Sequence, residues 1–197
     1  MATPYSVAAR DLLRNTLLDA ARDLLGSRSW ADVTMAEVAR AAGVSRQTLY
    51  NEFGSRDEFA IALVMREGDR FLTDVEAAIL ERIEDPPAAL EAAFELFLTT
   101  AAEDPLVRAI ALGDEADSLL PLVTTQGQPV VERAVERLTE TIATGWPQAA
   151  RADAELLAEH LVRLGISYAA LPHGSAHETA VATARLLTPF VERALGG

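Results

Sequence analysis

Apolar residues recur along most of this chain at spacings of three, four and seven, which is the pattern of amphipathic α-helices. The first such stretch covers residues 7–26. Further helices are predicted at about 34–43, 45–53, 55–83, 86–102, 105–112, 129–145, 152–171 and 175–195, with a short piece at 115–120. Alternating runs of β-branched residues, which would indicate strands, are missing. We therefore predict an all-α protein of about nine helices.

Capping residues support several of these boundaries. Thr34 and Glu37 have the spacing of a capping box, in which the hydroxyl caps the first turn and the carboxylate reaches back to the backbone of the capping residue. Ser55 and Glu58 repeat this pattern at the start of the long fourth helix. Pro189 lies inside the last predicted helix and is expected to kink or restart it.

Residues 34–53, TMAEVARAAGVSRQTLYNEF, have the properties of a helix-turn-helix. This motif needs two short helices that are held at a steep angle by shared apolar contacts. Gly43 supplies the positive φ angle of the turn. Val44 is expected to fill the turn, and Leu49 to face inward on the second helix. A plain helical hairpin with a solvated outer face is the simpler alternative, but such a hairpin rarely combines all of these features.

The side chains left on the outside of the second helix suit contacts with DNA. Arginine can reach guanine or a phosphate, while glutamine and asparagine can read an adenine edge. Threonine can touch a thymine methyl group or a phosphate, and tyrosine can donate to a phosphate. The predicted contacts on this helix are Ser45, Arg46, Gln47, Thr48, Tyr50 and Asn51.

Residues 17–63 resemble the TetR family of transcriptional regulators. The resemblance rests on the apolar first helix, the G-x-x-x-W entry, the core T-x-x-x-V-A-x-x-A-G-V-S, then L-Y-x-x-F and S-R-x-E after a glycine. It implies a three-helix DNA-binding domain, at residues 1–56, and a helical domain at 57–197 that dimerises and binds a small molecule. It also implies a homodimer that binds a palindrome in double-stranded DNA and is released by its effector. Most relatives repress, although some activate.

Matching by position adds Thr34 and Arg56 to the predicted DNA contacts. Arg56 stands where the family usually has a lysine that reaches a phosphate from the start of the fourth helix. Glu52 departs from the usual pattern and would repel phosphate, so we expect it to point away from DNA and to pair with Arg56. Arg10 and Arg14 either reach DNA from an N-terminal arm or are ordinary surface residues of the first helix.

The charge distribution agrees with this division of the chain. The net charge of −13 looks unfavourable for a DNA-binding protein, because Lys and Arg supply most of the affinity for phosphates. Residues 1–56, however, carry seven Arg and six acidic residues, a net of +1, whereas residues 57–197 carry ten Arg and 24 acidic residues, a net of −14. The local field at the contact face matters more than the total. An acidic surface is also common on soluble bacterial proteins.

The composition argues against several classes of function. The chain has no cysteine and no run of about 18 apolar residues, so we expect a cytoplasmic protein without disulfides, thiolate metal sites or a membrane partner. No phosphate-binding loop, nucleophile elbow or H-E-x-x-H motif indicates an enzyme or a cofactor. His173 and His177 have a spacing seen at metal sites, but only Glu178 accompanies them in the sequence, so we expect no metal. A helical protein-interaction module and, less favoured, an all-α enzyme are the alternatives.

The last two predicted helices are the candidates for a dimer interface. Apolar stripes run along both, and small residues would allow close packing in a four-helix bundle across a two-fold axis. Packing of these stripes within one subunit is the alternative, and the family resemblance favours the interface. The predicted interface residues are Leu157, Leu161, Tyr168, Ala180, Ala184, Leu187 and Val191.

An effector site in a helical bundle is expected to be mainly apolar, with a few polar groups. The chain has no cofactor motif, so we expect an apolar or amphipathic effector. The C-terminal half resembles family members that sense fatty-acyl or other lipid-related compounds. The candidate ligand-binding residues are Phe71, Phe94, Phe97, Leu98, Ile110, Trp146, His160 and Leu164.

Overall fold

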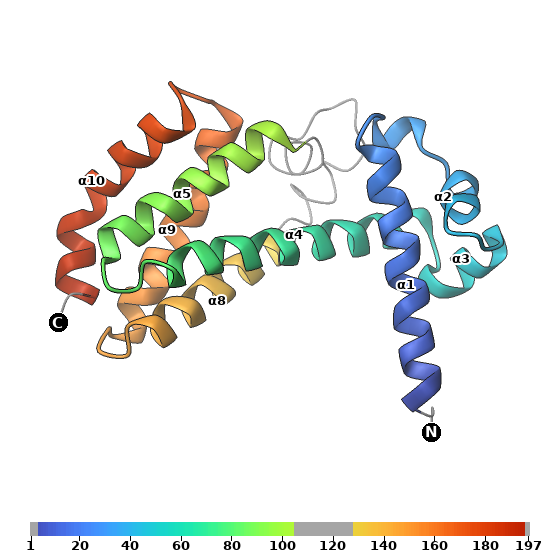
Figure 1. The fold of residues 1–197 in the computed structure, drawn as a ribbon, viewed down its shortest axis with the longest axis horizontal. Helices are drawn as coiled ribbons and strands as arrows, with labels where there is room; N and C mark the ends of the chain where they lie inside the picture. The colour runs from blue at the N-terminus through green and yellow to red at the C-terminus, as the bar shows by residue number, and fades with distance from the viewer. Residues whose placement is uncertain (1–3, 105–127, 196–197) are drawn as a thin grey trace.

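The structure, a computed structural model, describes residues 4–104 and 128–195. The regular elements in these two stretches are all helical, as the sequence predicts. The helices predicted at 105–112 and 115–120, and Ile110 with them, lie outside the described residues. The elements are α1 (Pro4–Leu25), the 3₁₀ turn η1 (Trp30–Asp32), α2 (Met35–Ala41), α3 (Arg46–Phe53), α4 (Arg56–Leu80), α5 (Pro86–Glu103), α8 (Gln128–Gly145), α9 (Arg151–Ala170) and α10 (Ala176–Leu195) (Figure 1).

Side-chain caps begin the helices where the sequence predicts them. Thr34 accepts from the backbone N–H of Glu37, whose carboxylate accepts from the N–H of Thr34, so the predicted capping box is complete. The Ser55 hydroxyl likewise accepts from the N–H of Glu58 at the start of α4. Contrary to expectation, α10 does not restart at Pro189 but runs unbroken through that position. Pro189 is exposed, so water can replace the N–H donor that proline lacks.

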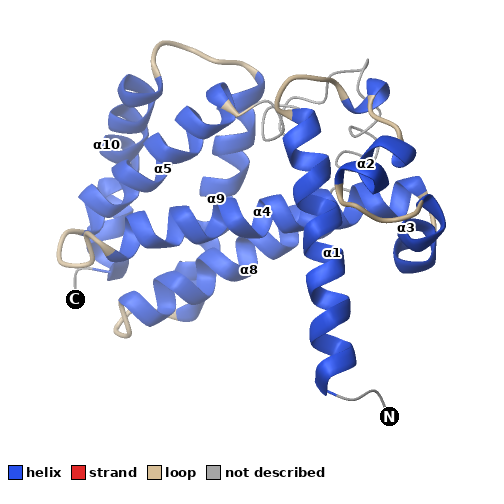
Figure 2. Ribbon diagram, turned by 45° about the vertical axis from the view of Figure 1, so that its right-hand side comes forward, coloured by secondary structure: helices blue, strands red, loops and turns tan. Residues whose placement is uncertain are grey.

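The three N-terminal helices and the first turns of α4 enclose one apolar core, which we call the N-terminal domain (Figure 2). Leu17, Leu49 and Leu63 are fully buried there, and the rings of Trp30 and Phe59 stack with their centroids 6.3 Å apart. Phe59 and Leu63 belong to α4. The core of this domain therefore extends beyond residue 56, and the start of α4 is an integral part of it.

The helix α4 runs from the N-terminal domain into a second bundle formed by α5, α8, α9 and α10, which we call the C-terminal bundle (Figures 1 and 2). Its 25 residues span about 37 Å. Within the bundle α10 packs along α5, α8 packs along α9, and α4 contacts both α5 and α8. One helix is therefore shared by both halves, so a tilt at one end must move the other. No helix in residues 4–104 and 128–195 has the length and hydropathy needed to cross a membrane.

Candidate nucleic-acid interface and effector cavity

One face of α3 is fixed in the core of the N-terminal domain. Leu49 is fully buried, and Phe53 contacts Phe59 edge-on with ring centroids 4.7 Å apart. Gly43 and Gly54, before and after α3, have φ angles of 72° and 82°. Glycine adopts such angles without the steric cost that a Cβ would impose. These two turns and the buried face set the direction of α3 and leave its other face in solvent.

The outward face of α3 is polar, and contacts one helical turn apart order its side chains. The Gln47 amide nitrogen Nε2 donates to Asn51 Oδ1 at 2.8 Å. The Arg46 guanidinium lies over the ring of Tyr50, 5.2 Å from its centroid. Pairs at this spacing stabilise a helix and reduce the side-chain freedom that binding would remove. Four of the predicted DNA contacts thus lie on one preordered surface.

Two more of the predicted contacts, Ser45 and Thr34, cap α3 and α2, and a third, Thr48, is hydrogen-bonded to Ser45. The Ser45 hydroxyl accepts from the Thr48 N–H at 3.0 Å and lies 2.8 Å from the Thr48 hydroxyl. The Thr34 hydroxyl donates to Glu37 Oε2 at 2.7 Å, and Arg28 donates to the same carboxylate at 3.0 Å. Hydrogen bonds from Thr34 and then from Arg28 lower the pKa of Glu37 to about 2. The Thr34 hydroxyl already donates to Glu37, so a phosphate contact by Thr34 would have to share this hydroxyl with the Glu37 carboxylate.

The structure shows Arg56 bonded within the N-terminal domain, while its predicted phosphate contact stays a prediction. Its guanidinium donates to the carbonyl oxygens of Val33 at 2.7 Å and Trp30 at 2.5 Å. The same group lies 4.5 Å from the centroid of a Trp30 ring. These bonds fasten the segment before α2 to the first turn of α4. The planar fork of arginine can serve both carbonyls and the ring together, which a lysine cannot.

Glu52 pairs with α1, so its predicted pairing with Arg56 is wrong. Arg10 and Arg14 each approach Glu52 Oε1 at 2.8 Å. The Glu52 side chain is 9% exposed, which agrees with the expectation that this carboxylate avoids the DNA-facing surface. Both arginines are engaged in tying α1 to α3, which favours their interpretation as residues of the first helix over that of a DNA-binding arm.

Arg40, which the sequence analysis did not single out, is an exposed cation near the turn of the motif. It lies in the last turn of α2 and has no ion pair with any residue in the described part of the chain. The first helix of a helix-turn-helix crosses the DNA backbone, so an exposed arginine there is a candidate phosphate contact. The position of Arg40 on the polar face of the first helix of the motif could have identified it from the sequence as a candidate contact.

Arg22 joins the N-terminal domain to the C-terminal bundle. It donates to the Glu67 carboxylate on α4 and, at 2.6 Å, to Asp104 at the end of α5. Glu67 is 3% exposed and also accepts from Arg66 at 2.9 Å. Removing the partners of a buried carboxylate is strongly unfavourable, so this network fixes α1, α4 and α5 at one point. Sequence reasoning missed it because the partners lie 45 and 82 positions from Arg22, where no local spacing relates them.

A second network fastens α4 to α8. Arg137 donates to Glu76 at 2.6 and 2.8 Å and to the backbone carbonyl of Asp69 at 2.8 Å. Arg133 donates to the Asp69 carboxylate at 2.6 Å. The hydrogen bond from Arg133, with a further one from Arg137, lowers the pKa of Asp69 below its usual value. Arginine–carboxylate pairs therefore connect α4 to the N-terminal domain and to the C-terminal bundle.

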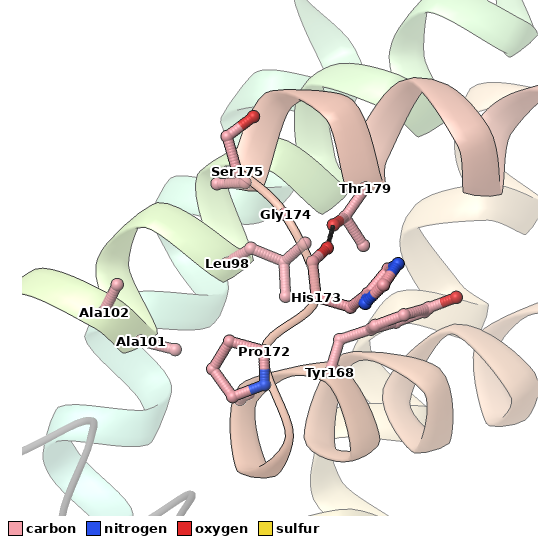
Figure 3. A pocket seen from close by; sticks show the side chains of 11 residues that line it. Leu98, Ala101, Ala102, Tyr168, Pro172, His173, Gly174, Ser175 and Thr179 are labelled. Carbon is pink, nitrogen blue, oxygen red and sulfur yellow. Dashed lines mark hydrogen bonds between the residues drawn. The ribbon is translucent and has the colours of Figure 1, made fainter.

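A cavity of about 280 Å³ lies between the last turns of α5 and α9 and the loop that leads to α10 (Figure 3). Leu98 and Ala101 of α5 and Tyr168 of α9 contribute mainly apolar walls. The loop and the first turn of α10 contribute polar groups, among them the Thr179 hydroxyl of α10, which donates to the backbone carbonyl of His173 at 2.8 Å. A mainly apolar cavity with few polar groups fits a small apolar or amphipathic ligand.

Five of the predicted ligand-binding residues gather at or behind this cavity. Leu98 lines it, and Phe94, Phe97 and Leu164 belong to the adjoining apolar cluster. Phe71 of α4 contacts Phe97 edge-on, with ring centroids 5.4 Å apart. This aromatic contact connects the cavity region directly to α4, the helix that continues into the N-terminal domain.

Two of the predicted ligand-binding residues lie elsewhere. Trp146 is buried at the other end of α5, where its indole N–H donates to the Ile83 carbonyl at 3.0 Å. His160 is exposed on α9, with Nδ1 2.8 Å from the backbone oxygen of Leu156. Helical periodicity placed both on apolar stripes but could not tell which end or side of the bundle those stripes occupy.

The apolar stripes that were predicted to form the dimer interface face the interior of the protomer. Four of the seven residues are at most 5% exposed, namely Leu157, Ala180, Ala184 and Val191. The other three, Leu161, Tyr168 and Leu187, are partly buried against the same cores. The prediction is therefore wrong for Leu157, Ala180, Ala184 and Val191, because α9 and α10 use these faces to pack along α8 and α5. The outer faces of α9 and α10 expose other apolar residues, namely Leu156, Val181 and Leu186.

Comparison with known proteins agrees with the geometry of both halves. Residues 17–63 match the family described as bacterial regulatory proteins, tetR family, and residues 85–189 match the family described as the bacterial tetracyclin repressor C-terminal domain. The chain is 42% identical over 190 residues to the transcriptional regulator AlkX of Mycobacterium tuberculosis, a match that covers 96% of this chain and 90% of that one.

Solved structures show the same fold. The TetR-family repressor AlkX from Dietzia sp. superposes with a TM-score of 0.79 and 34% identity, over 92% of this chain and 96% of the other. A TetR-family regulator from Pectobacterium atrosepticum gives a TM-score of 0.68 at 20% identity, over 100% and 99% of the two chains, which supports the fold alone. This chain belongs to the TetR family of bacterial transcriptional regulators, DNA-binding proteins that are not enzymes.

Proposed function

We propose that this protein is a repressor that binds a palindromic operator as a homodimer and is released by an apolar or amphipathic effector. The outer face of α3 carries the proposal. Its paired polar side chains are exposed, while the opposite face of the same short helix is fixed by Leu49. A helical hairpin whose outer face contacts only solvent would not need side chains able to read bases on a helix that is fixed in the core.

The proposed roles follow from the chemistry of each side chain. Arg46, Gln47 and Asn51 would read base edges in the major groove, because their donors and acceptors can match guanine or adenine. Thr48 and Tyr50 would contact phosphates. The capping hydroxyls of Ser45 and Thr34 lie at helix N-termini, where backbone N–H groups also favour an anion.

Two-fold symmetry of the operator requires two copies of the chain, and we place their contact on the outer faces of α9 and α10. The Leu186 side chain is 73% exposed, and Leu156 and Val181 are 46% and 38% exposed. A symmetric contact between two copies would cover these residues. Light scattering after size exclusion should give a dimer for the wild type and a monomer for Leu186→Glu. Leu12→Glu, a control at a 68% exposed site on α1, should remain dimeric. If Leu186→Glu also remains dimeric, the interface lies elsewhere.

The effector is proposed to be of the alkyl or fatty-acyl kind. The cavity walls are mainly apolar, and the similar repressor from Dietzia sp. is described as implicated in the biodegradation of n-alkanes. A volume of about 280 Å³ admits a compact or short-chain ligand without rearrangement. A thermal-shift series should therefore find stabilisation by compact or short-chain acyl and alkyl compounds. Stabilisation by polar metabolites, with acyl compounds silent, would exclude this class.

Release would follow from thermodynamic linkage through α4. Phe71 joins α4 to the aromatic cluster at the cavity, and Glu67 joins the same helix to α1. An effector that prefers one tilt of α4 changes the separation of the two α3 helices in the dimer. The effector must then weaken DNA binding by the same factor by which DNA weakens effector binding. Equal effector affinity with and without operator DNA would refute this mechanism.

Selection from random duplexes at moderate salt tests the central proposal. The wild type should enrich an inverted repeat whose half-sites are centred about 10 base pairs, or one helical turn, apart. Arg46→Ala should weaken binding to that repeat by about 10- to 100-fold, because each specific base contact contributes about 1–3 kcal/mol. Arg82→Ala is the matched control, because this exposed arginine follows α4, away from the proposed dimer contact, and its ion pair in the described part of the chain is with the adjacent Glu81.

Two results would contradict the DNA-reading surface. One is failure of the wild type to enrich any sequence even at low salt, where phosphate contacts are strongest. The other is equal loss of affinity in Arg46→Ala and Arg82→Ala. A promoter fusion carrying the selected operator then tests the sign of regulation. Expression should rise when the gene for this protein is deleted, and a fall would identify an activator.

A further inference from the structure

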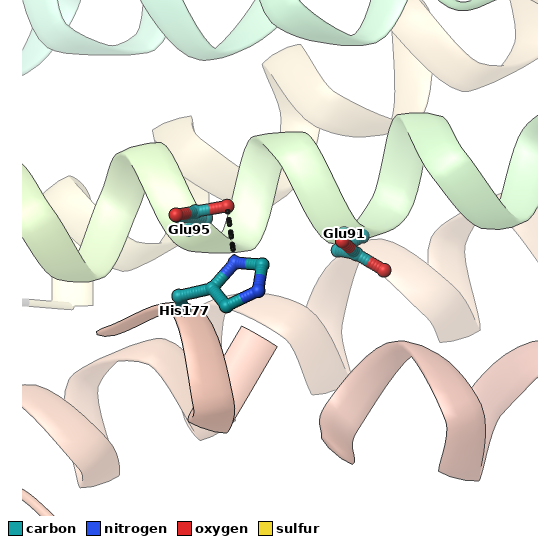
Figure 4. Close-up of side chains that lie close together, drawn as sticks. All are labelled: Glu91, Glu95 and His177. Carbon is teal, nitrogen blue, oxygen red and sulfur yellow. Dashed lines mark hydrogen bonds and ion pairs between the residues drawn. The ribbon is translucent and has the colours of Figure 1, made fainter. Parts of the chain in front are cut away.

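Three side chains with metal-binding groups meet on one side of the C-terminal bundle, apart from the α3 surface. Glu91 and Glu95 lie one turn apart on α5, and His177 reaches them from the first turns of α10 (Figure 4). One ligand atom from each residue lies within 4.8 Å of the other two. His177 Nδ1 is 3.2 Å from Glu95 Oε2. The three residues come from chain segments more than 80 positions apart, so the packing of α10 along α5 creates the cluster.

The surroundings leave this cluster negatively charged. Among the described residues Glu91 has no hydrogen bond or ion pair, and His177 is the ion-pair partner of Glu95. Both glutamates are only half-buried, so the group remains open to ions in solution. Two carboxylates and a neutral imidazole would carry a charge of about −2, which a divalent cation would neutralise.

The sequence analysis noted the spacing of His173 and His177 but predicted no metal, and these two histidines do not form the donor set together. His173 lies in the loop before α10, where it lines the cavity described above. Glu178, its other expected companion, is occupied at the N-terminus of α10. There its carboxylate accepts from the N–H and the hydroxyl of Ser175. Only His177 takes part, and its partners come from α5.

From this arrangement we infer a binding site for one divalent transition-metal ion at Glu91, Glu95 and His177. One imidazole nitrogen with carboxylate oxygens suits zinc, cobalt or manganese, whereas Mg²⁺ and Ca²⁺ prefer oxygen ligands alone. Three protein ligands leave at least one position for water, and the half-exposed cluster supplies access to it. Small rotations of the two glutamates would bring the donors to about 2.0–2.2 Å from a common centre.

An ion at this site would hold α5 and α10 together. Glu95 is adjacent in sequence to Phe94, which packs in the cluster beside the cavity, and His177 lies two residues before Thr179 of the cavity wall. The metal would therefore stiffen the helices that enclose the cavity. The site needs neither a particular operator nor a particular effector, so it can be tested independently of the proposed function.

The test uses the full-length, tag-free protein after dialysis against a chelator. Calorimetric titration with ZnCl₂ at pH 7.5 should give one ion per chain. His177→Gln and Glu91→Gln should each weaken binding at least tenfold, with His160→Gln as the matched control at another exposed histidine. At a hundredfold excess over the dissociation constant, Zn²⁺ should raise the melting temperature of the wild type by about 5–10 °C. The affinity should fall as the pH is lowered, because protons compete for the imidazole.

Binding Co²⁺ in place of Zn²⁺ gives a visible absorption spectrum that reports on the ligands of the ion, and a change in helix packing alone would not alter it. The visible absorption bands of the bound ion should shift or disappear in His177→Gln and persist in His160→Gln. Absence of saturable Zn²⁺ binding in the wild type would overturn the inference. So would equal binding in the wild type, His177→Gln and Glu91→Gln, because the ion would then sit elsewhere.

Discussion

Gly165, in the middle of α9, tests whether the aromatic cluster beside the cavity is as tightly packed as the structure indicates. A Cβ added at this glycine would lie 2.9 Å from Phe97 Cε1 and 3.1 Å from two further atoms of the same ring. Carbon atoms in favourable contact are about 3.5–4.0 Å apart. The ring cannot withdraw easily, because Phe71 and Phe94 pack against it with centroids 5.4 and 6.5 Å away. Gly165→Ala is therefore expected to overpack the cluster.

The expected magnitude follows from two opposing terms. Overpacking a dense core by one methyl group costs about 1–3 kcal/mol. Replacing glycine by alanine inside a helix returns about 1 kcal/mol. The net effect should be a loss of about 1 kcal/mol in the free energy of unfolding. Gly68→Ala in α4 supplies the control, because a Cβ there meets nothing within 4 Å. That variant should gain up to about 1 kcal/mol from helix propensity alone.

Urea denaturation at one fixed protein concentration measures both variants, since the stability of a dimer depends on concentration. Gly165→Ala should be about 2 kcal/mol less stable than Gly68→Ala, by subtraction of the two expected effects. Phe97→Leu should remove most of the penalty when it is combined with Gly165→Ala, because the clashing ring is then absent. If Gly165→Ala is as stable as Gly68→Ala, the cluster is loose and the reasoning about the cavity wall fails.

Three further predictions concern the N-terminal domain. Arg56→Lys should lower the free energy of unfolding by about 1–3 kcal/mol, because bonds to backbone carbonyls such as that of Trp30 are lost. The same change should alter DNA affinity less than threefold. Unchanged stability with weakened DNA binding would instead indicate that Arg56 contacts a phosphate. Since the pKa of Glu37 is lowered to about 2, its contribution is complete above pH 4.5 and is lost as the pH falls towards 2. Thermal melts of Glu37→Gln should therefore converge with the wild type near pH 2, and a constant difference would count against the linkage. Arg22→Met should speed hydrogen exchange in the last turn of α5, as measured by mass spectrometry. Arg70→Met should not, because this side chain is 60% exposed and its pairs to Asp19 and Glu67 are long, at 3.8 and 3.7 Å.

Local signals in the sequence predicted the helical elements well. The capping box at Thr34 and the capping serine at Ser45 act over three residues, so their geometry needs no knowledge of the rest of the chain. Gly43 adopts the positive φ angle for the same reason. The predicted restart at Pro189 was wrong, because whether a proline ends a helix depends on what surrounds the unpaired carbonyl, which the sequence does not state.

The roles of charged residues were predicted less well, because their partners are distant in sequence. Arg56 was expected at a phosphate, yet it bonds to carbonyls more than 20 positions earlier. Glu52 was expected to pair within its own neighbourhood, yet its partners lie on α1. The low exposure of the Glu52 carboxylate agrees with the expectation that it avoids the DNA-facing surface, which stays a prediction.

The sequence by itself determined the all-α class, the helix-turn-helix and the residue types on the outer face of α3, because these depend on periodicity and on spacings of three or four residues. Tertiary structure alone decided which of two apolar faces is buried. The stripe containing Ala180 and Val191 packs along α5, and the exposed Leu186 lies on the other side of the same helix. The same packing brought His177 to Glu95 across 82 positions. Hydrophobic periodicity shows that a face is apolar but not what covers it, because burial depends on contacts between segments that are far apart in the chain.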